Sequence, residues 1–427
     1  MDGKISAFID FLNTSHSPYH AAAQVCAMLE EAGFAQLQEQ QEWSLEPGGK
    51  YYLCHSGSCV IAFRIPEETA AGFMISASHS DRPAFQVKEN LELTGKYTRM
   101  ATEGYGGMIM STWLDRPLSI AGRVLVETEN GVRQQLVDID RDLLLIPNVA
   151  IHMNRTANEG MKFNPAVDML PLMGGEEDAG KLGKLLQQQV DGKILGHDLY
   201  LYLRQKASVW GLEEEFISAP ALDDLACVWC CTQGFLQAKP GKAINVLCVF
   251  DNEEVGSASY QGADSTLLRD VLKRICKASG QDYRRLLSQS LMVSADNAHA
   301  LHPNHPEFSD AANAPVVNGG VALKFTAQKK YTTDGYTAAI WRSICNKAGV
   351  PVQQYYNRAD LRGGSTLGNL SQTQVTVPAV DIGLPQLAMH SSYETAGVKD
   401  VAYLCDAMTA FYGSAIRKTG CDEYELI

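Results

Sequence analysis

Histidines and carboxylates gather where apolar runs of this sequence end. His79, for example, follows the run 74–78, and Asp296 follows the run 291–295. Such runs are expected to be strands of an open α/β sheet, in which ligands bind outside the carboxyl ends of the strands. Five separate segments therefore contribute polar side chains that we expect at one sheet edge. These side chains are His79, Asp81, Asp223, Asp224, Asp251, Glu253, Glu254, Asp296, His299 and His390.

The types of these side chains suit a divalent metal ion. Histidine and carboxylate ligands without cysteine favour an ion such as zinc, manganese or cobalt. There are enough of them for two ions that share a carboxylate, and paired ions about 3.5–4 Å apart acidify a bound water. Neighbouring side chains of an extended chain cannot both point at one ion. Of Glu253 and Glu254, one could therefore ligate while the other takes the proton from the water.

Each of these residues also has a structural interpretation. A histidine at a strand end is more often a hydrogen-bonded structural residue than a ligand, and Asp223 and Asp224 could form a helix N-cap. The convergence of five segments on one edge favours the metal site. Six other histidines are expected to be structural: His16, His20, His55, His197, His302 and His305.

Sequence motifs of other catalytic classes are absent. There is no G-x-S-x-G motif of a serine hydrolase and no P-loop that ends in Gly-Lys-Ser/Thr. The glycine-rich stretch 362–368 is therefore expected to line the metal crevice with backbone amides. Cys227, Cys230 and Cys231 have no second cysteine pair at a suitable distance and lie in an expected helix. This predicts buried core thiols rather than a zinc site.

The elements that position the candidate site alternate between helix and strand. Two short helices are expected over 5–33, with a break near Ser17-Pro18. The continuous apolar run 244–250 is typical of a strand buried on both faces. This alternation predicts an α/β fold with a mixed open sheet flanked by helices. Strands are expected at 51–54, 60–65, 73–78, 244–250, 290–295, 321–325 and 377–382, and helices at 225–238, 267–277 and from 399.

A stretch with a different sequence pattern interrupts this alternation of helices and strands. Short alternating segments such as 120–127 and 133–137 suggest β-hairpins, with a turn at 129–131. We therefore expect a catalytic domain formed by residues 1–88 and 214–427 and an inserted β-rich domain formed by residues 89–213.

The amino-acid composition limits the cellular compartment and the binding partners that we expect. The 427 residues include 36 Lys+Arg and 49 Asp+Glu, which gives a formal charge of −13. Net negative charge argues against nucleic-acid and anionic-membrane partners. No apolar run approaches the roughly 20 residues that span a bilayer, and the N-terminus lacks the pattern of a secretory signal. The eleven scattered cysteines fit free thiols in a reducing cytoplasm. A cytoplasmic protein is expected.

Several motifs together resemble the aspartyl aminopeptidase family of dinuclear zinc exopeptidases. The resemblance extends over nearly the whole chain, and its most specific parts are Asn-Glu-Glu-Val-Gly-Ser at 252–257 and Ala-His-Ala-Leu-His-Pro-Asn at 298–304. It implies two ions, most simply zinc, although manganese or cobalt would also suit the ligands. The implied metal ligands are His79, Asp223, Glu254, Asp296 and His390, with Asp223 between the two ions.

The same resemblance implies roles for other residues. Glu253 would be the general base that acts on a metal-bridging hydroxide, and Asp81 would orient the ring of His79. His299, Lys324 and Tyr331 match positions that contact substrate. Lys324 is the candidate for pairing with an acidic substrate side chain, because its compact ammonium group can form an ion pair with a carboxylate.

The resemblance also implies self-association. His152 matches a residue that reaches into the active site of a neighbouring subunit, and family members are homododecamers built from dimers through the insert. Two positions depart from the family pattern. Asp224 stands where asparagine is usual, and Arg82 stands where a small residue is commoner.

The resulting hypothesis is a cytoplasmic metalloaminopeptidase that removes N-terminal Asp or Glu from peptides. A second hypothesis is an aminopeptidase of broader specificity that prefers neutral residues. A third, from another class, is a non-catalytic oligomeric shell protein. Lost metal ligands would mark the third hypothesis, and none is lost in this sequence.

Overall fold

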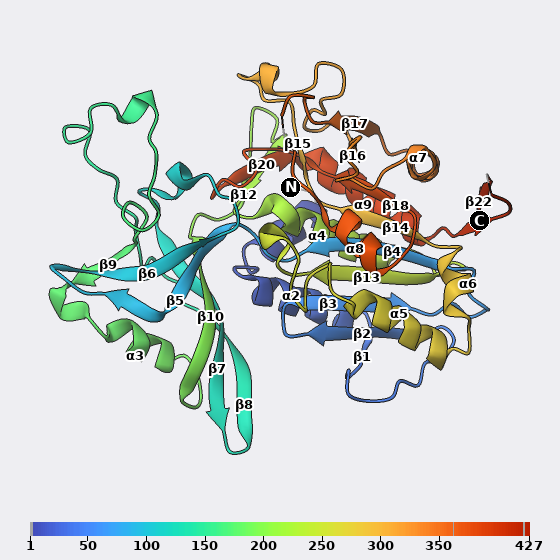
Figure 1. Ribbon diagram of the computed structural model, residues 1–427, viewed down its shortest axis with the longest axis horizontal. Helices are drawn as coiled ribbons and strands as arrows, with labels where there is room; N and C mark the ends of the chain where they lie inside the picture. Colours follow the sequence, from blue (N-terminus) through green and yellow to red (C-terminus); the bar gives the residue numbers. More distant parts are fainter. Residues whose placement is uncertain (1–2, 362, 422) are drawn as a thin grey trace.

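The fold is built around one large sheet and a smaller, separate one. A computed structural model describes residues 3–361, 363–421 and 423–427. In Figure 1 the large sheet and its helices occupy the right of the view, and the smaller sheet extends to the left. Within the described residues, no helix is both long enough and apolar enough to cross a membrane.

The large sheet has nine strands and is mixed. β4, β13, β14 and β18 run parallel to one another, whereas β3 is antiparallel to β13 and β16 is antiparallel to β18. This confirms the predicted α/β fold with a mixed sheet. In spatial order the strands are β1 (Ala35–Gln36), β2 (Lys50–His55), β3 (Cys59–Arg64), β13 (Ile244–Phe250), β4 (Phe73–His79), β14 (Leu291–Ala295), β18 (Ala379–Gly383), β16 (Val321–Phe325) and β17 (Val352–Tyr356).

Helices cover both faces of this sheet because alternate strand side chains point to opposite faces. In β13, Leu247 and Val249 pack into one hydrophobic cluster, and Val246 and Cys248 pack into the other. The first cluster includes α1 (Gly3–Leu12), α2 (Pro18–Glu31), α4 (Leu222–Gln237), α7 (Gly335–Ala348) and α9 (Val398–Tyr412). The second includes α5 (Leu267–Ala278), α6 (Tyr283–Leu287) and α8 (Leu367–Gln374).

The smaller sheet has six strands and is antiparallel throughout. Its strands, in spatial order, are β8 (Gly131–Asp138), β7 (Leu118–Thr128), β10 (Ile194–Leu203), β5 (Ala84–Leu93), β6 (Tyr97–Tyr105) and β9 (Leu172–Gly175). Leu182 and Leu186 of α3 (Lys181–Gln187) belong to its hydrophobic cluster. The sheet starts at Ala84, inside the expected first part of the catalytic domain. The exact division at 88/89 and 213/214 stays a prediction.

A third sheet of five short strands links the two regions. It contains β12, which follows the six-stranded sheet in sequence, and it contains β19 and β20, which flank His390. These strands, in spatial order, are β11 (Ser208–Trp210), β12 (Phe216–Ala219), β20 (Glu394–Gly397), β19 (Pro385–Leu387) and β15 (Ala298–His299). Near the C-terminus β21 (Ile416–Lys418) pairs with β22 (Tyr424–Leu426).

Most of the predicted helices and strands are confirmed, with small changes at their ends. The break between α1 and α2 falls at Ser17, whose hydroxyl caps α2 by accepting a hydrogen bond from the backbone N–H of His20. The buried cysteines of the 227–231 cluster lie in α4 and are free thiols, as predicted. Neither α7 nor α8 was predicted.

Candidate metal centre

The carboxyl edge of the large sheet opens onto a cavity of about 560 Å³. His79 ends β4 and lies opposite Phe250 at the end of β13, so the segment after Phe250 starts beside His79. β14 is parallel to β4 and delivers Asp296 to the same edge. The cavity is lined by most of the predicted site residues: His79, Asp223, Glu253, Glu254, Asp296, His299, Lys324, Tyr331 and His390.

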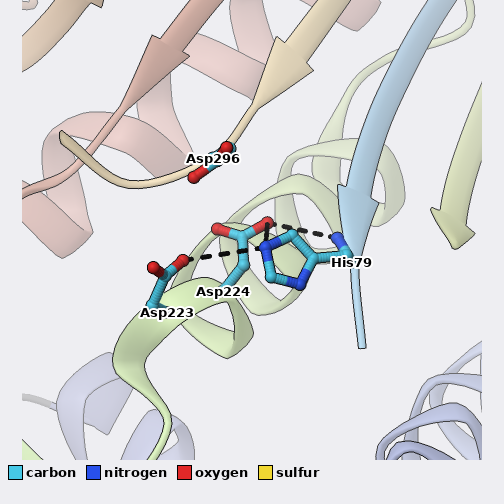
Figure 2. A group of neighbouring side chains, drawn as sticks. All are labelled: His79, Asp223, Asp224 and Asp296. Carbon is cyan, nitrogen blue, oxygen red and sulfur yellow. Dashed lines mark hydrogen bonds and ion pairs between the residues drawn. The ribbon is translucent and has the colours of Figure 1, made fainter. Parts of the chain in front are cut away.

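Asp223 lies between the two candidate histidine ligands. Its Oδ1 atom is 3.7 Å from Nε2 of His79, and its Oδ2 atom is 3.5 Å from Nε2 of His390. Figure 2 shows Asp223, Asp224 and Asp296 around the ring of His79. A carboxylate whose two oxygens face two different histidines is placed to bridge two ions.

The candidate ligands form three overlapping groups, two of which share Asp223, while the third joins His79 to Glu253 and Glu254. Ligand atoms of His79, Asp223, Asp224 and Asp296 all lie within 4.8 Å of one another. The second group joins Asp223 to Glu254 and His390, and Oε2 of Glu254 is 3.3 Å from Nε2 of His390. The assignment of these ligands to two separate ions stays a prediction. Asp224 was not predicted as a ligand but lies in the first group.

The residues fit divalent cations on electrostatic grounds. Oδ1 of Asp223 and Oε1 of Glu254 are buried and have no hydrogen-bond partner among the described residues. Burial raises the pKa of Glu253 to about 8, an effect that His79 opposes and Asp296 reinforces. Burial also raises the pKa of Asp296, although Lys324 opposes the shift. Buried carboxylates without enough positive charge are costly, and bound cations would compensate for them.

Asp223 and Asp224 do not cap α4. The residue at the N-cap position is Ala221, which makes no side-chain cap bond, and both aspartates have backbone angles outside the helical region. The peptide bond between the two aspartates is cis. Oδ2 of Asp224 instead accepts a hydrogen bond of 3.2 Å from the backbone N–H of His79. The N-cap interpretation is therefore wrong, and both carboxylates face the candidate metal centre.

Asp81 lies behind His79 and connects it to the Glu253-Glu254 pair. Its Oδ1 atom is 3.3 Å from Nδ1 of His79. Its two oxygens accept hydrogen bonds of 3.1 Å from the backbone N–H groups of Glu253 and Glu254. The hydroxyl of Tyr105, at the end of β6, also donates to Asp81 at 2.7 Å. A contact of this kind orients a metal-binding imidazole.

The segment that carries the two glutamates is not extended. Residues 253–255 form a 3-10 turn that follows Asn252, which has a left-handed backbone with φ of 62°. The expectation of an extended chain is therefore wrong. The turn still gives the two side chains different surroundings. Glu254 contacts His390, whereas Glu253 lines the cavity and lies close to His79.

Lys324 is buried beside Asp296. Its Nζ donates to the backbone carbonyls of Asp296 and Asn297, each at 3.0 Å, and lies 3.6 Å from Oδ2 of Asp296. It also lies 4.9 Å from the centre of the Tyr331 ring. Burial opposes the charge of Lys324, but the neighbouring Asp296 raises its pKa above the ordinary value. An ammonium group has three donors, and the two carbonyls together with Oδ2 of Asp296 place three acceptors around Nζ.

Glu394 is a functional candidate that the sequence interpretation missed. Its side chain is fully buried, and its two oxygens accept hydrogen bonds from the backbone N–H groups of His390 and Asp223, at 2.6 and 2.9 Å. The backbone carbonyl of Gly107 lies 2.6 Å from Nδ1 of His390. This contact leaves Nε2 free for a metal ion. The sequence gives only a weak signal, an acidic residue four positions after a candidate ligand.

The remaining predicted residues lie at different distances from the centre. His299 borders the cavity with an exposed side chain. His152 is exposed in a turn of the segment between β8 and β9 and is not among the residues that line the cavity. In the glycine-rich stretch, Gly364 and Ser365 line the cavity, whereas Arg362 lies outside the described residues.

Comparison with known proteins agrees with this geometry. The profile of the Aminopeptidase I zinc metalloprotease (M18) family matches residues 11–412. The chain belongs to this family. It is 42% identical to a probable M18 family aminopeptidase 2 of Clostridium novyi, over 95% of this chain and 97% of that protein. It is 38% identical to a probable M18 family aminopeptidase 2 of Pseudomonas aeruginosa, with the same coverage of 95% and 97%.

Solved structures give the same family assignment. Ape4, in its complex with Nbr1, is 34% identical and superposes with a TM-score of 0.93, over 96% of this chain and 85% of that chain. The S. cerevisiae mApe1 dodecamer is 25% identical, with a TM-score of 0.84 and coverage of 95% of both chains. This M18 protein is therefore an aminopeptidase of the zinc metalloprotease type, a hydrolase.

Proposed function

We propose that this M18 aminopeptidase removes N-terminal Asp or Glu from peptides. The observation that carries the proposal is Lys324, a buried cation that lines the cavity beside the candidate metal-binding carboxylates. A carboxylate side chain of the first substrate residue can pair with this ammonium group. Charge-assisted hydrogen bonds of this kind are stronger than neutral ones. His299 and Tyr331 line the same cavity and would contact the substrate as well.

The site would take two divalent ions, with zinc the first choice and manganese or cobalt as alternatives. The proposed ligands are His79 and Asp296 for one ion and His390 and Glu254 for the other, with Asp223 shared. When bound, such a pair acidifies a water and polarises the scissile carbonyl.

The protein's own residues would perform the proton transfers. Glu253 borders the cavity beside the proposed ligands and would accept a proton from the attacking water and return it to the leaving amine. Asp81 fixes the backbone of Glu253 and orients His79, so both groups are positioned before the substrate arrives. Acidic groups of the cavity would attract the free α-amine of the substrate.

The protein is also proposed to assemble into a cytoplasmic homododecamer built from dimers through the β-rich insert. Two observations support this proposal: the similar mApe1 chain forms a dodecamer, and His152 is exposed in the insert and available to a neighbouring subunit. An enclosed assembly would admit peptides rather than folded proteins.

Replacement of Lys324 by methionine tests the substrate preference. We expect kcat/KM for an N-terminal Asp substrate to fall on the order of 100-fold, because loss of one partner of a buried charge pair costs about 2–5 kcal/mol. Hydrolysis of an N-terminal Leu substrate should change by less than about threefold, since a neutral side chain gains nothing from the ammonium group.

Lys330→Met is the matched control. Lys330 is nearby in sequence, but its Nζ donates to the Gly363 carbonyl at 3.0 Å and it does not line the metal cavity. Metal content is measured in both variants, because Lys324 also contacts the backbone of Asp296. An equal loss on Asp and Leu substrates with full metal content would contradict the role of Lys324 as the selector.

A further inference from the structure

A small cavity adjoins the candidate metal centre at Asp223. Its volume is about 20 Å³, and its lining includes Arg82, Trp113, Asp223, Ser392 and Glu394. It forms where five parts of the chain meet: the segment after β4, the η1 turn (Met110–Trp113) after β6, the end of β10, the start of α4 with the residues before it, and the segment that leads into β20. The cavity therefore adjoins both the insert and the residues that support the proposed ligands.

Two buried donors of the cavity residues have no partner among the described parts of the chain. They are Nη2 of Arg82 and Nε1 of Trp113. The other end of the Arg82 guanidinium is fixed, since its Nη1 donates to the Ser15 carbonyl at 2.7 Å. The Trp113 ring is fixed by an edge-to-face contact with Phe85, with ring centres 5.2 Å apart. Buried polar groups are rarely left without a hydrogen bond.

The cavity has the size and chemistry for one water molecule. To hold a water, a cavity needs a volume of about 10–15 Å³ and two to four polar partners. Arg82 and Trp113 offer donors, and the carboxylate of Glu394 offers an acceptor in the same lining. The carboxylates of Glu394 and Asp223 disfavour an anion there, whereas a water can accept from the donors and donate to Glu394.

We propose that Arg82 and Trp113, through one ordered water, fix Glu394, which in turn positions the metal ligands Asp223 and His390. Glu394 accepts the backbone N–H groups of both ligands, so a small movement of this one carboxylate displaces both. The cationic Arg82 also compensates for the buried charge of Glu394. Arg82, which departs from the family pattern, thus acts as a positioning residue outside the substrate cavity.

The inference rests on the proposed assignment of Asp223 and His390 as metal ligands, but not on the proposed preference for acidic substrates. The η1 turn is attached to the His390 segment by two further bonds. The hydroxyl of Ser392 donates to the Thr112 carbonyl at 2.6 Å, and its N–H donates to the Thr112 hydroxyl at 2.9 Å. The insert thus reaches the metal ligands through the turn that carries Trp113.

Zinc affinity of the full-length protein, measured by competition with a chromophoric chelator and without peptide, tests this proposal. We expect Glu394→Gln to weaken zinc binding by about 10- to 100-fold, as is typical when a supporting partner of a metal ligand is lost. Arg82→Met and Trp113→Phe should weaken it by about 3- to 10-fold, a smaller effect because each removes one hydrogen bond to the water. KM for a peptide should change little while kcat falls.

Trp341→Phe is the matched control. Trp341 is also buried, and its Nε1 also lacks a partner among the described residues, but it lies in α7 and does not line this cavity. It should retain wild-type zinc affinity. Wild-type affinity in both Arg82→Met and Trp113→Phe, with normal thermal unfolding, would overturn the water link. Wild-type affinity in Glu394→Gln would overturn its positioning role. A wild-type protein that binds no zinc would instead overturn the ligand assignment.

Discussion

Glu253→Gln is expected to lose peptidase turnover by on the order of 10³-fold and to keep both metal ions. The amide has nearly the same shape but cannot accept the proton of the attacking water, and general acid–base catalysis contributes roughly 10²–10⁴-fold. Glu253 lines the cavity and is fixed through its backbone by Asp81. The measurements are kcat on an N-terminal Asp reporter amide and metal content after dialysis.

The neighbouring Glu254→Gln variant is the control for this result. Glu254 contacts His390 at 3.3 Å and is a proposed ligand, so its replacement should lower metal content as well as turnover. The two variants differ by one position in the chain and are expected to differ in metal binding. Normal turnover in Glu253→Gln would exclude this residue as the base, and loss of metal from it would make it a ligand instead.

Asp223→Asn should abolish activity by removing the carboxylate that is proposed to bridge the two ions. An asparagine oxygen can face one histidine, but its amide nitrogen would face the other and cannot ligate. We expect the affinity for at least one ion to fall by more than about 100-fold. The loss of a residue that only supports a metal ligand usually has a smaller effect on metal affinity. Stepwise zinc titration followed by calorimetry, together with initial rates, measures both effects.

Asp224→Asn provides the comparison for Asp223→Asn. Asp224 is the next residue, and its carboxylate accepts the backbone N–H of His79, which an amide oxygen can also accept. Its replacement is expected to cost less than about tenfold in activity. If Asp224→Asn removed metal as strongly as Asp223→Asn, Asp224 would be a ligand and the assignment of a single bridging carboxylate would be wrong.

The sequence was most informative where burial on both faces leaves a continuous apolar run. β13 is such a run, and the residues that follow it could be placed at the sheet edge because parallel strands end there together. The helix α7 was missed, although Asp334 and Thr337 form a capping box at its start. The helix α8 has the sequence LGNLSQTQ, in which few apolar residues recur with helical spacing.

The supporting residues could not be predicted because they depend on contacts between distant segments. Tyr105 reaches Asp81 from the end of a strand in the insert, and Glu394 binds two backbone groups that lie far apart in sequence. The local spacing of apolar residues in the sequence carries no information about such contacts. His390 has a left-handed backbone with φ of 66° in the turn after β19. Its position follows from that turn and from the Gly107 carbonyl rather than from the preceding strand.

The most direct test of the account is the initial rate of the wild-type protein on reporter amides of Asp, Glu, Leu, Ala and Lys, with and without a chelator. We expect rapid release from Asp and Glu, little release from the other three, and loss of activity when the metal is removed. Release from Leu that equals or exceeds release from Asp would contradict the role assigned to Lys324. Release that persists after complete removal of metal would contradict the metal centre itself.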